Sequence, residues 1–256
     1  MARRPSDRFL SANRPPPKSA ENRLLAALPD TDYDRIVPSL DVLPLKLKQI
    51  LHAPLKPVRH IYFPREGFCS QLTVLANGRM IEVATIGREG AVGLLSGAGD
   101  GSVPSATMVQ GPTRTSVRMP MKMFTEEMDR GGAFFDLVSR YRLALVRFIM
   151  QSTACNAAHT VEERLARWLL TAQDHLGSDV FPLTQEFVAM MLGVTRPSVS
   201  EVAGTLQRAG LIKYRRGEVT VVDREQLRAA ACECYAITAT FVRRTTNLAA
   251  SPRSAR

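Results

Sequence analysis

The chain has 256 residues, of which 45% are hydrophobic, enough for one large or two ordinary domains. Its formal net charge of +10 favours polyanionic partners, although the basic residues are spread along the whole sequence. No apolar run approaches the roughly 20 residues that span a bilayer, and no apolar signal core follows Arg3-Arg4. The four cysteines are too few and too scattered for a disulfide framework. We therefore expect a cytoplasmic protein with no membrane span.

The first half of the chain changes from a tail to a β-rich region. Residues 1–20 are rich in Arg, Pro and Ser, which predicts a disordered basic tail, and residues 21–28 form a short helix before Pro29. The expected short strands are residues 43–47, 58–63, 68–75, 80–86, 106–110 and 115–119. Asn77-Gly78 suits a type I′ hairpin turn, and the last two strands are expected to pair around Gly111-Pro112. Short strands at regular intervals predict a β-roll or barrel.

A long helix follows the β-rich region. After a short helix at residues 120–129, Gly131-Gly132 separates it from a helix at residues 133–159. Apolar and small residues recur there at alternating spacings of four and three: Phe134, Val138, Tyr141, Leu145, Phe148, Ser152 and Cys155. This is the spacing of a coiled-coil seam of about three heptads, so we expect a parallel homodimer. The alternative is that the stripe packs on the chain's own β-roll.

Residues 183–222 predict two short helices, a tight turn and a basic hairpin. Thr184 and Thr195 are N-caps, Gly193 ends the first helix, and Pro197 is tolerated in the first turn of the second. The second helix, Arg196–Ala209, buries apolar residues on one face and shows polar ones on the other. This is a helix-turn-helix pattern with a recognition helix.

A hairpin and a last helix follow the recognition helix. Residues 211–214 and 219–222 are β-rich, and Arg215-Arg216-Gly217-Glu218 between them gives a cationic tip suited to a phosphate backbone. Asp223–Thr245 is expected to be one C-terminal helix. The alternative to a winged helix is an ordinary pair of core helices.

The segment Leu183–Val222 resembles the winged helix of the CRP/FNR regulators, the family of the cyclic AMP receptor protein. The resemblance extends upstream to Val161–Leu170 and, more diffusely, to Asn22–Pro29. It implies an α+β fold with an N-terminal cyclic-nucleotide-binding-like jelly roll, a long dimerisation helix and a C-terminal winged helix-turn-helix. The implied parts are a tail at 1–20, a sensor domain at 21–130, a dimerisation helix at 131–160, a DNA-binding domain at 161–245 and a flexible tail at 246–256.

The chain departs from the cyclic AMP-binding pattern of that family. Residues 87–95 stand where the family's phosphate-binding cassette lies, and their N–H groups could cradle an anion. A plain glycine-rich turn is the alternative. Leu94 replaces the glutamate that follows glycine in cyclic-nucleotide binders, and Pro104-Ser105-Ala106 lacks the arginine that holds the phosphate. A desolvated phosphate needs a paired cation, so cyclic AMP is not expected to bind.

Other sensor chemistries of the family also lack support. No cysteine precedes Cys69, so the iron–sulfur ligands of the FNR type are missing. The candidate axial ligands for haem are His52, His60, His159 and His175, each of which is more simply a core or surface residue. Cys232 and Cys234 are expected to be buried thiols in a terminal helix rather than a redox switch. We expect no cofactor and no metal site, and we leave the effector unassigned.

The sequence therefore predicts a homodimeric, sequence-specific transcription regulator without enzymatic activity. The residues expected to read bases are Arg196, Ser198, Ser200 and Glu201. The residues expected to contact the DNA backbone are Thr184, Gln185, Gln207, Lys213, Arg215 and Arg216. The candidate effector pocket holds Arg88, Glu89, Gly90, Gly93 and Ser105. Double-stranded DNA is the expected partner, and RNA polymerase is a further candidate. The alternative function is a sensor that regulates through protein partners.

Overall fold

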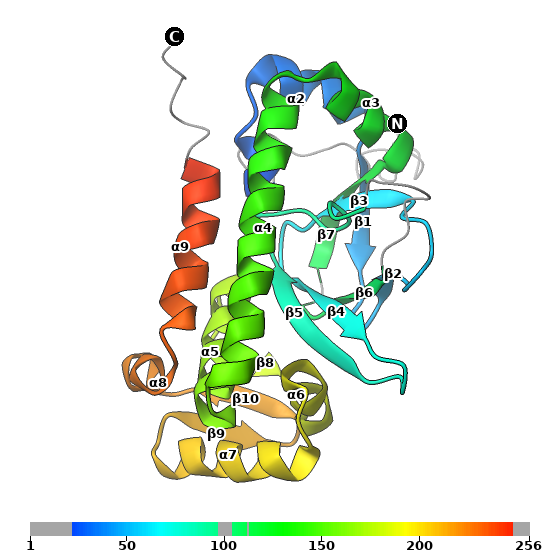
Figure 1. Cartoon of the computed structure of the whole chain (residues 1–256). Coiled ribbons are helices and arrows are strands. Elements are labelled where there is room, and N and C mark those ends of the chain that lie inside the picture. The colour runs from blue at the N-terminus through cyan, green and yellow to red at the C-terminus, as the bar shows by residue number, and fades with distance from the viewer. Residues whose placement is uncertain (1–21, 97–103, 112, 248–256) are drawn as a thin grey trace, which may run out of the picture.

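The computed structural model describes residues 22–96, 104–111 and 113–247 (Figure 1). The tail expected at residues 1–20, and all but two residues of the tail expected at 246–256, lie outside this range. Residues 246 and 247 instead belong to the last helix. Among the described residues, no helix combines the length and the apolar character needed to cross a membrane.

The N-terminal half is a β-roll of two antiparallel sheets preceded by short helices. One sheet has the strand order β1-β7-β3 and the other β2-β6-β4-β5. The elements are α1 (Arg23–Ala26), α2 (Asp30–Ile36), η3 (Val37–Ser39), β1 (Asp41–Leu45), β2 (Ile50–His52), β3 (His60–Phe63), β4 (Cys69–Val74), β5 (Met80–Ile86), β6 (Ser105–Val109) and β7 (Thr113–Pro120). This confirms the predicted jelly-roll-like architecture.

The expected pairing of the two strands around residues 111–112 is wrong. β6 pairs with β2 and β4, whereas β7 pairs with β1 and β3 in the opposite sheet. The N–H groups of Gln110 and Gly111 both donate to the carbonyl of Phe68, at 2.8 and 3.1 Å. Gly111 also lies so close to the Gly67 backbone that a Cβ on either glycine would clash. The chain is therefore held at the start of β4 and crosses between sheets instead of folding back on itself.

The β4–β5 hairpin forms as predicted, but its turn is not of type I′. Gly78 has a φ of +79°, whereas Asn77 does not adopt a positive φ, which type I′ requires. The Gly78 N–H donates to Leu75 O, and the Leu75 N–H donates to Arg79 O, each at 2.8 Å. This pattern fits a three-residue loop in which a type I turn is followed by a left-handed glycine.

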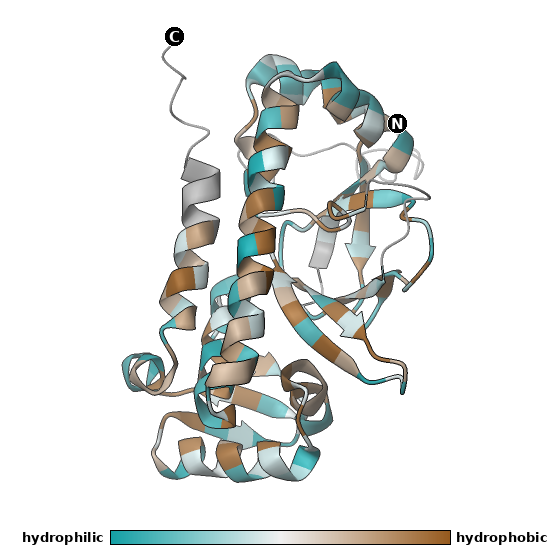
Figure 2. Cartoon of the chain, viewed as in Figure 1, coloured by the Kyte–Doolittle hydropathy of each residue, from teal (hydrophilic) through white to brown (hydrophobic). Residues whose placement is uncertain are grey.

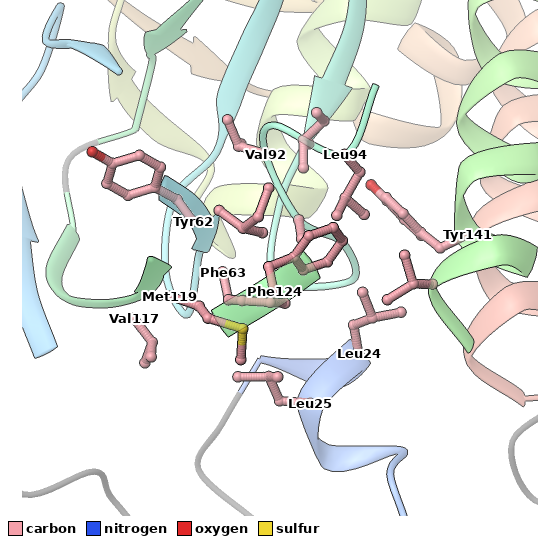
Figure 3. Packing of buried hydrophobic residues seen from close by; sticks show 14 of the residues in the cluster. Leu24, Leu25, Tyr62, Phe63, Val92, Leu94, Val117, Met119, Phe124 and Tyr141 are labelled. Atoms are coloured by element: carbon pink, nitrogen blue, oxygen red, sulfur yellow. The ribbon is translucent and has the colours of Figure 1, made fainter. Parts of the chain in front are cut away.

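The long helix packs its predicted seam inward, not toward a second chain. After α3 (Met121–Arg130), α4 (Gly132–Ala158) lies along the roll (Figure 1). The five residues expected in a dimer seam are 1–7% exposed within this one chain and belong to its main core: Phe134, Val138, Tyr141, Leu145 and Phe148. Figure 3 shows Tyr141 reaching from α4 into the cluster that holds Leu94. The placement of these five residues in a dimer seam is therefore corrected, because burying this face against the roll removes it from water.

The C-terminal half is a winged helix with an extra strand. Its elements are α5 (Val161–Leu176), β8 (Val180–Pro182), α6 (Gln185–Leu192), α7 (Arg196–Arg208), β9 (Ile212–Arg215), β10 (Glu218–Val221), α8 (Arg224–Ala230) and α9 (Cys234–Asn247). β8 joins the wing strands in the order β8-β10-β9. Figure 2 shows hydrophobic residues scattered along these elements and along α4.

The single C-terminal helix predicted for residues 223–245 is wrong, because the chain breaks it into two. Asp223 caps α8 as expected, its carboxylate accepting from the Gln226 N–H at 2.9 Å. Ala231 then adopts an extended conformation (φ −84°, ψ 150°), and α9 begins at Cys234. Figure 1 shows α9 turning back to run beside α4. The break contains neither Gly nor Pro, so packing of α9 on α4 explains it and local propensity does not.

An apolar cluster that is distinct from the main core of the roll spans the two halves. Phe68, Leu72 and Met108 from the roll cluster with buried residues of α5, α6 and α7. At the centre of this contact, Trp168 Nε1 donates to Glu82 Oε1 at 3.0 Å, and the Ser70 hydroxyl donates to Glu82 Oε2. Arg79 Nη2 also donates to Gly193 O at 3.0 Å, which links the β4–β5 hairpin to the turn after α6.

The buried Glu82 carboxyl should make stability depend on pH. Burial raises its pKa from 4.5 to about 7, against the lowering effects of Ser70, Arg167 and Trp168. Because the folded-state pKa lies above the unfolded one, folding is favoured most below pH 4.5 and weakens as pH rises to about 7. Over this pH range the free energy of unfolding falls by about 3 kcal/mol. We expect Glu82→Gln to remove this dependence of the unfolding free energy on pH. Above pH 7 the variant should be more stable than the unmodified protein.

Urea unfolding at a series of pH values measures this effect. Glu218→Gln is the control, because Glu218 is an exposed carboxyl in the wing. Parallel pH profiles for Glu82→Gln and the unmodified protein would show that Glu82 is not the responsible group.

Candidate functional site

The helix-turn-helix is built by the caps that the sequence predicts. Thr184 Oγ1 accepts from the Phe187 N–H at 3.3 Å, and Thr195 Oγ1 accepts from the Ser198 N–H at 3.4 Å. Gly193 ends α6 in the left-handed region with φ +67° and ψ 30°. The inward faces of the two helices are buried through Val188, Ala189, Met191, Leu192, Val199, Ala203 and Leu206. These contacts fix α7 and leave its polar face in water.

The outward face of α7 carries three of the four predicted base-reading residues. Arg196, Ser200 and Glu201 are exposed. Arg196 Nη1 lies 3.0 Å from Glu186 Oε1 on α6, with both side chains 63% exposed. The Ser200 hydroxyl donates to Gln185 Oε1 at 2.6 Å. An exposed ion pair of this kind contributes little to stability, so Arg196 can exchange Glu186 for another acceptor at small cost.

Two further predicted contact residues, Ser198 and Gln207, also have structural hydrogen bonds. The half-buried Ser198 shares a 2.9 Å hydroxyl–hydroxyl bond with the cap residue Thr195. Gln207 Oε1 accepts from the Tyr214 N–H at 2.8 Å and so ties the end of α7 to β9. Their hydrogen bonds position the recognition helix, which the sequence pattern alone did not reveal.

The wing tip is a tight turn of two left-handed residues. Arg215 pairs with Glu218 across the hairpin, while Arg216 and Gly217 have φ values of +52° and +79°. This is the type I′ pattern, and it places exposed Lys213, Arg215 and Arg216 on a single hairpin. The tip of this hairpin lies against the start of α6, where the Leu183 N–H donates to Gly217 O at 2.7 Å.

Tyr214 is a positioning residue that the sequence analysis missed. Its hydroxyl donates to Leu183 O at 2.7 Å, which fastens the wing to the start of α6. Burial raises the pKa of Tyr214 to about 12, and the charge of Glu186 adds to the effect, so the donor stays protonated. Its aromatic character in a β-rich run indicated only a strand residue.

In the turn at residues 87–95, for which the sequence offers either an anion cradle or a plain glycine-rich turn, a carboxylate of the chain itself accepts a hydrogen bond. Glu89 is 4% exposed, and its Oε1 accepts from the Gly87 N–H at 2.7 Å. Its Oε2 lies 3.6 Å from His175 Nδ1 on α5. A Cβ on Gly90 would come within 1.7 Å of the Tyr141 hydroxyl oxygen, so this glycine serves close packing on α4. The turn is therefore a structural contact between the roll, α4 and α5.

The five candidate effector residues do not form one pocket. Gly93 lines a void of about 10 Å³ inside the roll, together with Leu94 and Leu145. Ser105 accepts a hydrogen bond from the Gln71 side chain. Arg88 and Glu89 instead line a separate cavity of about 610 Å³ between the roll, α5 and α9. Among the described residues, the roll interior beside Gly93 has no room for a nucleotide.

Comparison with known proteins supports the DNA-binding domain and the fold. Residues 163–230 match the family model of the Crp-like helix-turn-helix domain. The search of curated proteins gave no match. Among solved structures, FixK2 from Bradyrhizobium japonicum has a TM-score of 0.64 at 17% identity, over 75% of this chain and 98% of that one.

Two further structures share the architecture. TTHB099, a CRP-family transcriptional regulator from Thermus thermophilus, has a TM-score of 0.60 at 22% identity, over 73% of this chain and 95% of that one. CLP of Xanthomonas campestris, described as a c-di-GMP responsive global regulator, has a TM-score of 0.60 at 14% identity, over 75% of this chain and 99% of that one.

The fold and the exposed recognition helix define a transcription regulator with a DNA-binding helix-turn-helix. Residues 163–230 belong to the Crp-like helix-turn-helix domain family, and the described chain shares the fold of solved structures such as the CRP-family regulator TTHB099.

Cyclic AMP should leave the thermal stability of this regulator unchanged. The roll interior is filled beside Gly93, and Glu89 accepts the turn's Gly87 N–H. A nucleotide at 100 times its Kd would stabilise the folded state by about 2.7 kcal/mol, which thermal unfolding detects easily. The measurement is Tm with and without cyclic AMP, with a cyclic AMP-dependent regulator as positive control. A rise in Tm comparable to that of the control would refute this expectation.

Proposed function

We propose that this regulator acts as a homodimer that recognises a near-palindromic operator, in the cytoplasm, and that its effector is not cyclic AMP. The observation that carries the proposal is the exposed polar face of α7 beside a cationic wing. The caps and buried contacts described above hold that face rigidly, as a reading surface requires. RNA polymerase is the proposed partner in regulation.

In this proposal α7 enters the major groove and reads bases with its first turns. Arg196 offers a planar fork that suits guanine O6 and N7, and Glu201 can accept from a cytosine amine. Ser198 and Ser200 stand on the same helix as smaller hydrogen-bonding groups. DNA would replace Glu186 as the partner of Arg196, which the exposed geometry of the ion pair supports. Glu201 replaces the arginine of the cyclic AMP receptor protein, so a different operator sequence is expected.

The DNA backbone contacts would come from both sides of α7. The wing contributes Lys213, Arg215 and Arg216, which are exposed cations on one hairpin. Thr184 and Gln185 stand at the N-terminus of α6, where free N–H groups and the helix dipole favour a phosphate. Gln207 is proposed to act by holding the wing against α7.

The dimer would form along the outward face of α4. The apolar residues exposed there are Phe135 (43%), Leu143 (52%), Val146 (42%) and Met150 (66%). At 100° per residue they fall within an arc of about 80°, opposite the buried stripe. With Ser139 they follow spacings of four, four, three and four, which is the pattern of a coiled-coil seam. A second copy of α4 covers such a stripe symmetrically, and two copies of α7 then meet half-sites about 34 Å apart.

Arg196→Ala should relax specificity at one base pair of each half-site. A selection from random duplexes first defines the operator, and competition binding with every single-base variant then measures the effect. We expect the variant to lose about 1–3 kcal/mol of binding free energy on the operator. Changing the base pair that Arg196 contacts should then cost the variant little further affinity. Arg59→Ala is the control, because Arg59 is exposed on the β-roll. Equal losses of affinity on all duplexes would show that Arg196 contacts the DNA backbone and not a base. Binding with no salt dependence would instead favour regulation through protein partners.

Leu143→Asp should convert the dimer to a monomer. A charge in each chain at the centre of the seam would be buried beside its symmetry mate, which is strongly unfavourable. Sedimentation equilibrium measures the mass. Val222→Asp is the matched control, since Val222 is 50% exposed in the DNA-binding domain, against 52% for Leu143. The proposed α4 seam is contradicted if the Leu143→Asp variant is still a dimer. It is also contradicted if the unmodified protein is a monomer.

A further inference from the structure

Three cysteines and a histidine converge where the sensor half meets the DNA-binding half. The ligand atoms of Cys155, His159, Cys232 and Cys234 all lie within 4.8 Å of one another. Cys155 Sγ lies 3.5 Å from Cys232 Sγ, and Cys234 Sγ lies 3.7 Å from His159 Nδ1. The cysteines are 0–5% exposed and form a small core cluster of their own. No role in DNA binding accounts for this cluster.

The fold brings the four residues together from segments far apart in the sequence. Cys155 stands one turn from the end of α4, and His159 follows four residues later, directly before the capping residue Thr160 of α5. Cys232 and Cys234 lie in and at the end of the break between α8 and α9. The break that the sequence did not predict is thus the place where two thiols turn toward α4.

The distances suit a tetrahedral metal ion. With Zn–S bonds of about 2.3 Å, the sulfur atoms of a tetrahedral site stand about 3.8 Å apart. The Cys155–Cys232 sulfur separation of 3.5 Å and the Cys234 Sγ–His159 Nδ1 separation of 3.7 Å lie close to that value, and all four ligand atoms lie within 4.8 Å of one another. Three cysteines and one histidine are one of the ligand sets of structural zinc sites, which are closed and four-coordinate.

The residues around the cluster are those that a zinc site needs. His159 Nε2 lies 3.2 Å from Glu233 Oε2, so a carboxylate can hold the ring with Nδ1 directed at the thiols. Gln151 Nε2 donates to Cys234 Sγ at 3.0 Å, a bond that strengthens when the sulfur is a thiolate. These partners would fix the orientation of two of the four ligands.

Two buried arginines supply an independent sign that an anion belongs here. Arg164 and Arg167 are 7% and 6% exposed, and the Nε atom of each has no hydrogen-bond partner within the part of the chain that the structure describes. The charge of Arg164 acts on Cys155 and Cys232, and that of Arg167 acts on Cys155. Zinc bound to three thiolates and a neutral imidazole carries one net negative charge. Such a group would place a negative charge beside these two buried cations, where neutral thiols place none.

We propose that Cys155, His159, Cys232 and Cys234 bind one Zn²⁺ ion per chain. The ion clamps the end of α4 to the start of α9, on either side of the DNA-binding domain. It closes a loop that contains the entire winged helix, so its binding free energy stabilises the position of that domain relative to the sensor half. Binding releases the thiol protons as the three Zn–S bonds form.

The test uses the full-length protein purified without chelator under a non-thiol reductant. We expect elemental analysis to find one zinc per chain. After removal of zinc, Co²⁺ should bind in the same ratio and give thiolate-to-metal charge-transfer and tetrahedral ligand-field absorption. Cys234→Ser and Cys155→Ser should abolish this spectrum. Cys69→Ala is the control, because Cys69 is a buried cysteine of β4 outside the cluster, and it should bind as the unmodified protein does.

Two milder variants keep the test decisive if the cysteine variants do not fold. His159→Gln removes one ligand, and Glu233→Gln removes the partner of that ligand while keeping all four. We expect zinc affinity to fall at least tenfold for the first, and 10- to 100-fold for an outer-shell change such as the second. Zinc should raise the Tm of the unmodified protein. The proposal is overturned if the reduced protein takes up no metal, or if uptake is unaffected by these substitutions. It is also overturned if the protein carries iron with sulfide, or if a Cys155–Cys232 disulfide forms equally with and without zinc.

Discussion

Burial of one face of α4 against the β-roll is the constraint on which the rest of the structure depends. Phe134, Tyr141 and Phe148 place that face in the main core. The rest of the helix is then free for other contacts, with α9 packed along one side and an apolar stripe left outward. Because α4 ends at Ala158, immediately before α5, its position also sets where the DNA-binding half begins.

Contacts between the halves suggest how a change in the roll could reach DNA. The β4–β5 hairpin touches α5 through Glu82 and Trp168, and it touches the turn after α6 through Arg79 and Gly193. That turn leads directly into α7. A displacement of this hairpin would therefore be transmitted to the recognition helix. The transmission would go through hydrogen-bonded neighbouring residues and not through a flexible linker.

Some polar side chains of the helix-turn-helix hold the fold together, and others remain open to contact DNA. Thr184, Thr195 and Gln207 have acceptors engaged with backbone N–H groups, which fixes the angle of α7 and the wing. The Arg196 side chain pairs with the exposed carboxylate of Glu186, and the wing cations face water. A rigid frame with weakly paired outer groups keeps the ordering cost of binding small, since little besides side-chain rotation must change.

Local sequence determined the helix-turn-helix, its caps, the wing and the short strands, because Thr, Gly and Pro act within a few residues of their own positions. Tertiary structure decided which face of α4 is buried: two stripes share the same period, and only contact with the roll distinguishes them. It likewise separated β6 from β7 and broke the last helix at Ala231. Glu89 and His175 meet for the same reason, as do Cys155 and Cys232. Long-range packing, which single-sequence patterns do not encode, brings such pairs together.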